Sequence, residues 1–170
     1  MTESVWLSPL GKMRLIVNNN FLIYCNWEED DCNKKLHNLY KDIGEYQQEK
    51  SEEMEIINDV EKQLTEYFKG ERKVFELPIM MNGTEFRRSV WRKIAEVSYG
   101  KKLSYGELAA WVGKPRGSRA VANACGANPI AIIIPCHRIT GSNGYLGGYT
   151  GGIEKKKRLL EIEQGISSCK

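Results

Sequence analysis

The stretch 132–139, IIIPCHRI, places a cysteine and a histidine directly after three isoleucines and a proline. Three consecutive β-branched residues are typical of a buried strand, so we predict one over 132–134. Because Pro135 cannot donate a backbone hydrogen bond to a neighbouring strand, the strand is expected to stop there. The next three residues would then lie at a strand end, where a rigid scaffold can present reactive groups.

The chain of 170 residues is 41% hydrophobic, enough for the core of one ordinary domain or two small ones. No apolar run approaches a membrane span, and the N-terminus lacks a secretory signal pattern. The five cysteines are odd in number and without framework spacing, which favours a reducing, cytoplasmic location, or a nuclear one in a eukaryote. Cys25 and Cys32 have no close second pair of ligands, and only His37 is nearby, so no metal is expected.

Charge is distributed unevenly along the chain. Residues 1–80 carry 10 Lys/Arg against 16 Asp/Glu, a formal charge of −6, whereas residues 81–170 carry 15 against 6, a charge of +9. A basic half indicates a polyanionic partner, with DNA or RNA first. A solvated, lysine-rich surface without such a partner is the alternative that charge alone leaves open.

The first half of the sequence predicts a small α/β unit. Two apolar segments, 13–17 and 21–27, flank three asparagines that tolerate tight-turn conformations, so we predict two strands and, after them, an acidic loop. Spaced apolar residues over 36–68 predict a helix, and 73–79 predicts a short strand closed by a proline. No reactive groups gather here, so we expect residues 1–78 to form a supporting domain.

Residues 79–170 are expected to form a second, mostly helical domain. Thr84 is a suitable N-cap for a first helix, and Ser104 with Glu107 has the spacing of a capping box for a second. A third helix is predicted from 119 onward, ending before a proline. Two helices joined by a short turn that contains glycine have the outline of a helix-turn-helix.

The third helix has an unusual composition for one that reads DNA bases. After Arg119 its positions are small or carry only an amide, apart from one valine: Ala120, Ala122, Asn123 and Ala124. Base reading in the major groove usually uses long donors, whereas small residues allow close approach to the shape and phosphates of DNA. A tightly packed core helix would have the same pattern, and the residues alone leave both interpretations open.

A free thiol has a pKa of about 8.5 and is mostly protonated at neutral pH, so a nucleophilic Cys136 needs activation. His137 could accept its proton, directly or through a water, and would itself need an acid to fix its tautomer. The last predicted helix, 153–164, carries KKKR on one side and two leucines on the other, and Glu163 lies on the leucine side. A structural Cys-His dipeptide and a glutamate at a frayed helix end are the alternatives.

Longer segments carry a resemblance to a known family. The segment 119–139, RAVANACGANPIAIIIPCHRI, followed by GYTGG, closely resembles the O6-alkylguanine-DNA alkyltransferases, suicide DNA-repair proteins in which Pro-Cys-His-Arg surrounds the acceptor cysteine. GTEFRRSVWRKI, LSYGELA, SPLGKMRLIV and LTEYFKGERKVFELP are similar to other parts of that family, so the resemblance covers nearly the whole chain. It implies an α+β fold: a small ribonuclease H-like α/β domain, then a mostly helical, winged-helix-like domain with a helix-turn-helix.

By this resemblance, Cys136 is the alkyl acceptor and His137 activates it through a water. Glu163 orients the histidine, and Asn128 lies at a hinge between the third helix and the cysteine. Arg119 would insert into the duplex in place of an extruded base. The implied substrate-binding residues are Tyr105, Ile139, Tyr149, Thr150 and Gly151, and the implied DNA-binding residues are Arg119, Tyr105 and Ser142.

The activity that the resemblance implies is irreversible transfer of the alkyl group from O6-alkylguanine, and also O4-alkylthymine, in double-stranded DNA to Cys136 of a monomeric protein, with base flipping. A Cys-His-Glu arrangement cannot hydrolyse the thioether product, so one turnover and no cofactor are expected. The zinc ligands of mammalian relatives are not reproduced here. The alternatives are a non-catalytic helix-turn-helix protein that senses lesions and a Cys-His hydrolase. The lesion-binding relatives carry tryptophan at the position of Cys136.

Overall fold

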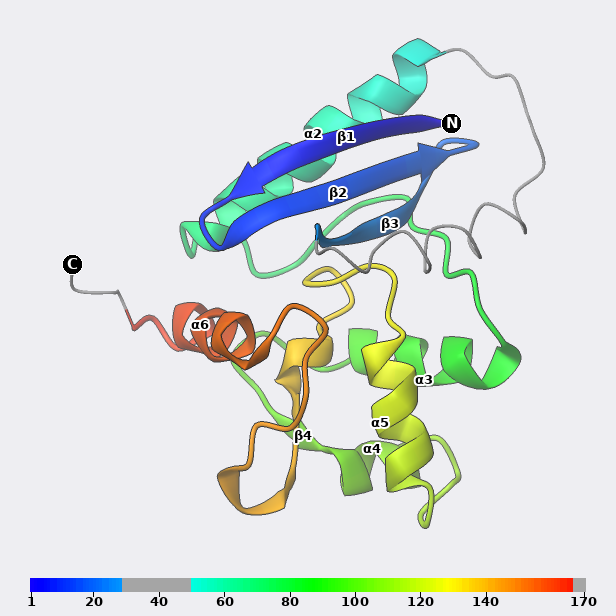
Figure 1. Ribbon diagram of the computed structural model, residues 1–170, viewed down its shortest axis with the longest axis vertical. Helices are drawn as coiled ribbons and strands as arrows, with labels where there is room; N and C mark the ends of the chain where they lie inside the picture. Colours follow the sequence, from blue (N-terminus) through cyan, green and yellow to red (C-terminus); the bar gives the residue numbers. More distant parts are fainter. Residues whose placement is uncertain (29–49, 167–170) are drawn as a thin grey trace.

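A computed structural model describes residues 1–28 and 50–166. A sheet with one helix forms the N-terminal half, and a mostly helical C-terminal half lies beneath it in Figure 1, which confirms the expected mixture of a sheet unit and a helical unit. Along the chain the elements are β1 Thr2–Ser8, β2 Gly11–Asn18, β3 Phe21–Trp27, α2 Lys50–Phe68, α3 Glu85–Ala95, β4 Leu103–Ser104, α4 Tyr105–Trp111, α5 Ser118–Gly126, η1 Cys136–Arg138, β5 Ile139–Thr140, η2 Ser142–Gly144 and α6 Ile153–Glu163.

The N-terminal sheet is antiparallel in the order β1-β2-β3, and β2 and β3 confirm the two predicted strands. Asn19 and Asn20 form the turn between them with φ angles of 50° and 61°, left-handed conformations that asparagine tolerates. The sequence does not predict β1, because this edge strand has several polar residues and leaves Val5 and Leu7 exposed. It therefore lacks a continuous apolar face.

Helix α2 covers one face of this sheet (Figure 1), and four of its side chains are buried in the core: Ile57, Val60, Leu64 and Tyr67. The predicted part of this helix over 36–49, and the acidic loop before it, lie outside the described residues. No helix in the described ranges, α2 included, is long and apolar enough to cross a membrane.

The predicted strand over 73–79 is wrong. The segment meets β3 only at its end, where the Leu22 N–H donates to the Pro78 carbonyl at 2.7 Å. Upstream, the Gln63 side chain of α2 donates to the Glu76 carbonyl and accepts from the Glu76 N–H, at 3.0 Å and 2.9 Å. A side chain thus takes the backbone groups that a strand would offer to its neighbour.

The predicted helix starts in the C-terminal half are confirmed. The Thr84 hydroxyl accepts a backbone hydrogen bond at the start of α3, and Ser104 and Glu107 form a capping box at the start of α4. Trp91 of α3 is 1% exposed and donates its indole N–H to the Ala124 carbonyl of α5 at 2.8 Å. This contact holds α3 against α5.

The predicted strand over 132–134 is also wrong, because these residues form a turn in which Ile132 has a φ of 70°. The Asn128 side chain accounts for the turn: its Oδ1 accepts from the Ile130 N–H at 3.0 Å, and its Nδ2 donates to the Ile134 carbonyl at 2.8 Å. Both Ile132 and Ile134 are fully buried. The apolar run therefore predicts burial correctly but not the backbone, and the cysteine begins the short helix η1 instead of ending a strand.

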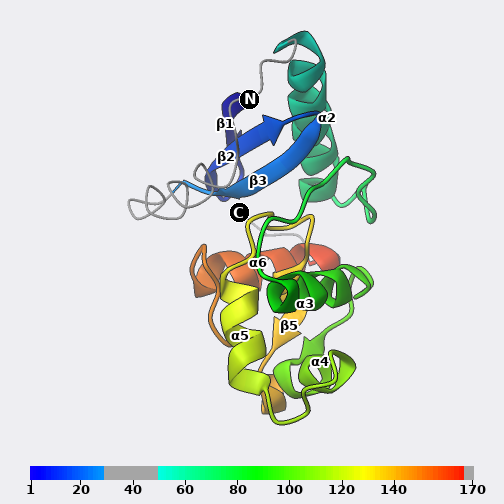
Figure 2. The same ribbon diagram turned by 90° about the vertical axis from the view of Figure 1, so that its right-hand side faces the viewer.

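The segment that contains this turn rises from the helical half to meet β3, as both views show (Figure 1, Figure 2). The Cys25 N–H donates to the Pro129 carbonyl at 2.9 Å, and the Ala131 N–H donates to the Cys25 carbonyl at 2.7 Å. On the other side of η1, β5 pairs in parallel with β4, with Leu103 opposite Ile139. The cysteine segment is therefore fixed at both ends by backbone hydrogen bonds.

Candidate active site around Cys136

Cys136 is the first residue of η1 and is 6% exposed. The Asn128 Nδ2, which also holds the preceding turn, donates to the cysteine Sγ at 3.2 Å. Burial raises the pKa of the Cys136 thiol, while the Asn128 hydrogen bond and the nearby Lys156 charge act in the opposite direction. These two groups offset only part of the effect of burial, so Cys136 rests as a thiol and needs a base to form the thiolate that attacks electrophiles.

The carboxylate of Glu163, at the end of α6, lies at the centre of a buried network. His137 Nε2 is 2.6 Å from Oε1, and the Tyr67 hydroxyl donates to the same oxygen at 2.8 Å. The Arg138 Nε donates to Oε2 at 3.0 Å, and the Gly100 N–H donates to Oε2 at 2.9 Å. The glutamate is thus a buried, fully bonded acid, not the frayed helix end of the alternative interpretation.

The charges in this network define the tautomer of the histidine. Burial alone would raise the pKa of Glu163, but its hydrogen bonds and charge interactions with His137 and Arg138 lower the pKa to about 2. Burial lowers the pKa of His137, against the opposing effect of Glu163, so the ring is neutral at pH 7. Because a carboxylate only accepts hydrogen bonds, Nε2 carries the ring proton and Nδ1 is the acceptor. Among the described residues, Nδ1 has no hydrogen-bond partner.

Lys156 of α6 brings a second buried charge to the site. Its side chain is 0% exposed, its Nζ donates to the Ile139 carbonyl at 2.5 Å and to the Gly148 carbonyl at 3.3 Å, and it lies 5.7 Å from the centre of the Tyr105 ring. Burial lowers the pKa of Lys156 to about 8. The carbonyl of Ile139, a predicted base-contacting group, thus already accepts one hydrogen bond.

Tyr105 begins α4 and is positioned by the loop that follows β5. Gly147 has a φ of +71°, and a Cβ at this position would lie 2.8 Å from the Tyr105 ring, so the glycine backbone packs directly on the phenol. Burial raises the pKa of Tyr105 to about 12. The hydroxyl therefore keeps its proton at neutral pH and can donate a hydrogen bond.

The three residues predicted to form the pocket wall all contact other parts of the protein. The Thr150 hydroxyl donates to the Gly126 carbonyl at the end of α5, at 2.9 Å. The Tyr149 hydroxyl is buried, and burial raises the pKa of this phenol well above its usual value. Gly151 is buried against the Trp27 indole of β3, which leaves no space for a Cβ.

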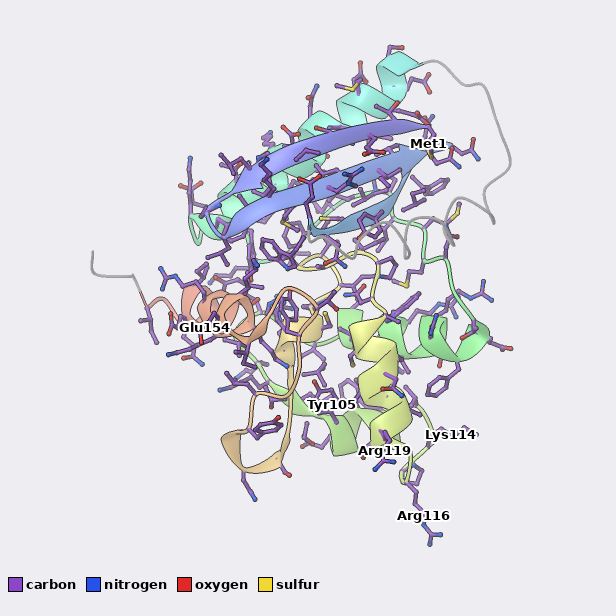
Figure 3. All side chains as sticks on the ribbon, viewed as in Figure 1. Met1, Tyr105, Lys114, Arg116, Arg119 and Glu154 are labelled. Atoms are coloured by element: carbon purple, nitrogen blue, oxygen red, sulfur yellow. The ribbon has the colours of Figure 1, made fainter. Side chains whose placement is uncertain are left out.

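Two of the three predicted DNA-binding residues, Arg119 and Ser142, are exposed, whereas Tyr105 is half-buried. Arg119, Ala120, Asn123 and Gly126 of α5 are exposed, whereas Val121, Ala124 and Cys125 of the same helix are buried. Helix α5 therefore presents its small residues to solvent, and the packed-core alternative does not describe that face. Figure 3 shows Arg119, Arg116 and Lys114 at the end of the helical half farthest from the sheet. Ser142 is also exposed, on η2.

The structure brings the four residues predicted to be catalytic into one buried cluster, and it adds four that the sequence does not predict: Tyr67, Arg138, Lys156 and Asn26. The helical spacing of Lys156 could have identified it, because it precedes the buried Leu159 by three residues and therefore lies on the same, inward face. The prediction that the whole KKKR run lies on the side opposite the leucines is wrong for this residue. Within residues 1–28 and 50–166, no group of three or more His, Cys, Asp or Glu side chains could hold a metal ion.

Comparisons with known proteins agree with this architecture. The family description "6-O-methylguanine DNA methyltransferase, ribonuclease-like domain" matches residues 1–81, and the DNA binding domain of the same family matches residues 85–165. The methylated-DNA–protein-cysteine methyltransferase of Methanosarcina acetivorans is 39% identical over 163 residues, 96% of this chain and 98% of that protein. The protein of the same name from Haemophilus influenzae is 34% identical and covers 92% of this chain and 83% of its own length.

A solved structure extends the likeness to three dimensions. The crystal structure of Mycobacterium tuberculosis OGT in complex with DNA has a TM-score of 0.79 and 32% identity to this chain, and the match covers 97% of this chain and 94% of that one. Sequence and fold therefore agree over almost the full length, and the chain belongs to the 6-O-methylguanine DNA methyltransferase family.

Proposed function

We propose that this protein repairs DNA directly, by irreversible transfer of the alkyl group of O6-alkylguanine, and also of O4-alkylthymine, to its own Cys136. The observation that carries the proposal is the buried arrangement in which Asn128 donates to the cysteine sulfur while Glu163 fixes a neutral His137 with Nδ1 as acceptor. The family relationship names the reaction class, and this geometry supports Cys136 as the nucleophile and His137 as its base.

The reaction is a displacement at an sp³ carbon. His137 Nδ1 takes the thiol proton through a water, and the sulfur attacks the alkyl carbon as the bond from that carbon to O6 breaks. The electron pair of that bond stays on guanine, which takes up a proton, so the products are guanine and a thioether. Tyr105, with its retained hydroxyl proton, donates to ring atom N3 as charge develops on the base. The thioether is stable, so each chain acts once.

DNA binding is assigned to the helical half. Helices α4 and α5, with the turn between them, form a helix-turn-helix whose exposed small residues let α5 approach the minor groove closely. The target nucleotide must leave the base stack, at a cost of a few kcal/mol. Arg119 fills the gap, Ser142 contacts the backbone, and the basic half holds phosphates without reading sequence. In this proposal the protein acts as a monomer.

The division of labour follows the two halves of the chain. Residues 1–78 form the supporting domain, and residues 79–170 carry both DNA binding and the acceptor cysteine. Tyr149, Thr150, Gly151 and the main chain at Ile139 line the pocket for the flipped base. A cytoplasmic location, or a nuclear one in a eukaryote, remains our prediction.

Incubation with duplex DNA that carries radiolabelled O6-methylguanine tests the proposal. We expect one label per chain, located on Cys136 by peptide mapping. Cys136→Ser is expected to bind DNA but to remain unlabelled, and Cys125→Ala, the matched change at another buried cysteine, is expected to retain labelling. DNA binding without label on the wild-type protein would indicate a lesion-sensing module, and repeated turnover would indicate a hydrolase. Either outcome contradicts alkyl transfer.

A further inference from the structure

Two adjacent residues at the end of β3, Asn26 and Trp27, touch opposite sides of the site; we call this pair the β3 clamp. Both belong to the N-terminal half, which also supplies the Tyr67 hydroxyl to the Glu163 carboxylate but contains neither the acceptor thiol nor its base. Asn26 is 3% exposed and Trp27 is 3% exposed. Figure 1 and Figure 2 show β3 as the strand of the sheet that faces the helical half.

Asn26 fixes the main chain of the residue that holds the thiol. Its Nδ2 donates to the Asn128 carbonyl at 3.0 Å, and its Oδ1 accepts from the Trp27 N–H at 3.0 Å. Asn128 in turn donates to the Cys136 sulfur at 3.2 Å. Two consecutive hydrogen bonds therefore connect a strand of the N-terminal sheet to the nucleophile, through groups that are all buried.

The backbone of Cys25, next to Asn26, also connects β3 to the segment that follows Asn128. Cys25 exchanges two backbone hydrogen bonds with the 129–131 segment, at 2.9 Å and 2.7 Å. A buried carbonyl without a hydrogen-bond partner destabilises the folded protein, and Asn26 supplies the partner of the Asn128 carbonyl. An asparagine in the otherwise apolar run FLIYC-N-W is thus explained by the group it faces across the two halves.

Trp27 packs against the predicted pocket wall. Its indole covers Gly151 so closely that a Cβ there would overlap the ring. The Lys155 Nζ lies 5.2 Å above the Trp27 ring and also donates to the Gly151 carbonyl at 3.0 Å. The Trp27 side chain therefore limits how far the 149–151 segment can move towards the sheet.

We propose that the β3 clamp positions the reacting groups: Asn26 holds the Asn128–Cys136 pair in its bonded geometry, and Trp27 holds the 149–151 wall at the distance that the alkylated base requires. This proposal rests on the alkyl-transfer function proposed above and assigns a specific task to the N-terminal half. Neither residue touches the substrate, so both are positioning residues.

The test of Asn26 compares Asn26→Leu with Ile23→Ala, a change at a fully buried side chain of the same strand that is not part of the core cluster containing Cys25 and Ile130. Two quantities are measured on folded protein. The first is the single-turnover rate of label transfer. The second is the thiol ionisation curve, followed by ultraviolet absorbance of the thiolate with the Cys136→Ser protein as background.

For Asn26→Leu we expect the rate to fall at least tenfold and the thiol to ionise at higher pH, because Asn128 no longer faces the sulfur in a fixed orientation. Ile23→Ala is expected to lower the melting temperature without moving the ionisation curve. Equal ionisation curves for Asn26→Leu and wild type would overturn the role of Asn26. The ionisation measurement needs no DNA, so it reports on Asn26 even if the wild-type protein transfers no label.

Trp27→Leu separates binding from chemistry. We expect the lesion concentration that gives half the maximal rate to rise several-fold, while the maximal rate and the thiol ionisation curve change less than twofold. A fall in the maximal rate with unchanged half-saturation would contradict the assignment of Trp27 to the wall.

Discussion

Oε1 of Glu163 lies 2.6 Å from Nε2 of His137, and the guanidinium of the following residue, Arg138, binds the same carboxylate at 3.0 Å. The three groups are buried, and the charges of the guanidinium and the carboxylate balance each other. One acid therefore fixes the histidine tautomer and also compensates the charge of a buried arginine. Changing the carboxylate to an amide affects both tasks, and the loss of each is measured by a different assay.

Glu163→Gln is expected to reduce the rate of alkyl transfer by about 10²–10⁴-fold, the usual contribution of a general base, because His137 loses the carboxylate that fixes its tautomer. The unpaired Arg138 should also cost about 3–5 kcal/mol of stability. Label transfer on folded protein and urea unfolding measure the two effects. Glu161→Gln, on the same helix but in a partly exposed pair with Arg158, should cost at most about 0.5 kcal/mol and leave the rate unchanged.

The unfolding free energy should depend on pH through Glu163. Its pKa is 4.5 as a reference and about 2 in the folded protein, so between these values the unfolded chain binds more protons than the folded one. The stabilisation, about 3 kcal/mol, is complete above pH 4.5 and disappears as the pH falls towards 2. Urea unfolding over this range should show a smaller loss for Glu163→Gln than for wild type. Parallel curves would contradict the prediction.

Gly147→Ala should destabilise the protein by about 1–3 kcal/mol, because an alanine is strained at a φ of +71° and its Cβ meets the Tyr105 ring. Displacement of the phenol should also weaken lesion binding. The matched control is Gly148→Ala, where a Cβ meets nothing within 4 Å and φ is not in the left-handed region. Thermal unfolding and lesion-binding titrations should show lower stability and weaker binding for Gly147→Ala than for Gly148→Ala. Equal melting temperatures and affinities would show that the contact with Tyr105 contributes to neither.

Arg119→Ala should leave stability unchanged, because the side chain is exposed, and should reduce repair of a lesion in duplex DNA by about tenfold, equivalent to ~1.4 kcal/mol of transition-state stabilisation. Transfer from the free base O6-methylguanine should be unaffected. Arg116 lies on the turn before α5. Arg116→Ala should weaken binding to any duplex and reduce the slope of the logarithm of the binding constant against the logarithm of salt concentration by about one. Equal loss of repair on duplex and free base would remove the insertion role of Arg119.

Local sequence rules predict the helix starts of this protein well and its cysteine segment poorly. Thr84 and the Ser104–Glu107 pair act within one helical turn, so their neighbours in the sequence are also their neighbours in space. The isoleucine run behaves otherwise, because Asn128 binds the backbone groups that a strand would use. Gln63 has the same effect on the 73–79 segment. In both cases a side chain from outside the segment decides the backbone conformation.

The candidate site divides in a similar way. Cys136, His137 and Glu163 follow from their chemistry, from helical spacing and from the family resemblance. Tyr67 and Asn26 do not, since each meets the site through a contact between residues 70 to 102 positions apart. Only the packing of the sheet unit on the helical unit brings such groups together. The spacing of residues within one segment does not predict contacts of this kind.

The pairing of β3 with the 128–131 segment joins residues about one hundred positions apart. Contacts of such long sequence separation form late during folding, because closing the intervening loop costs entropy before any contact compensates it. During synthesis, residues 25–26 leave the ribosome long before their partners. We therefore expect the hydrogen bond from Asn128 to the thiol to reach its final geometry only after the two halves of the chain have packed together, so that newly made protein gains repair activity as a last step of folding.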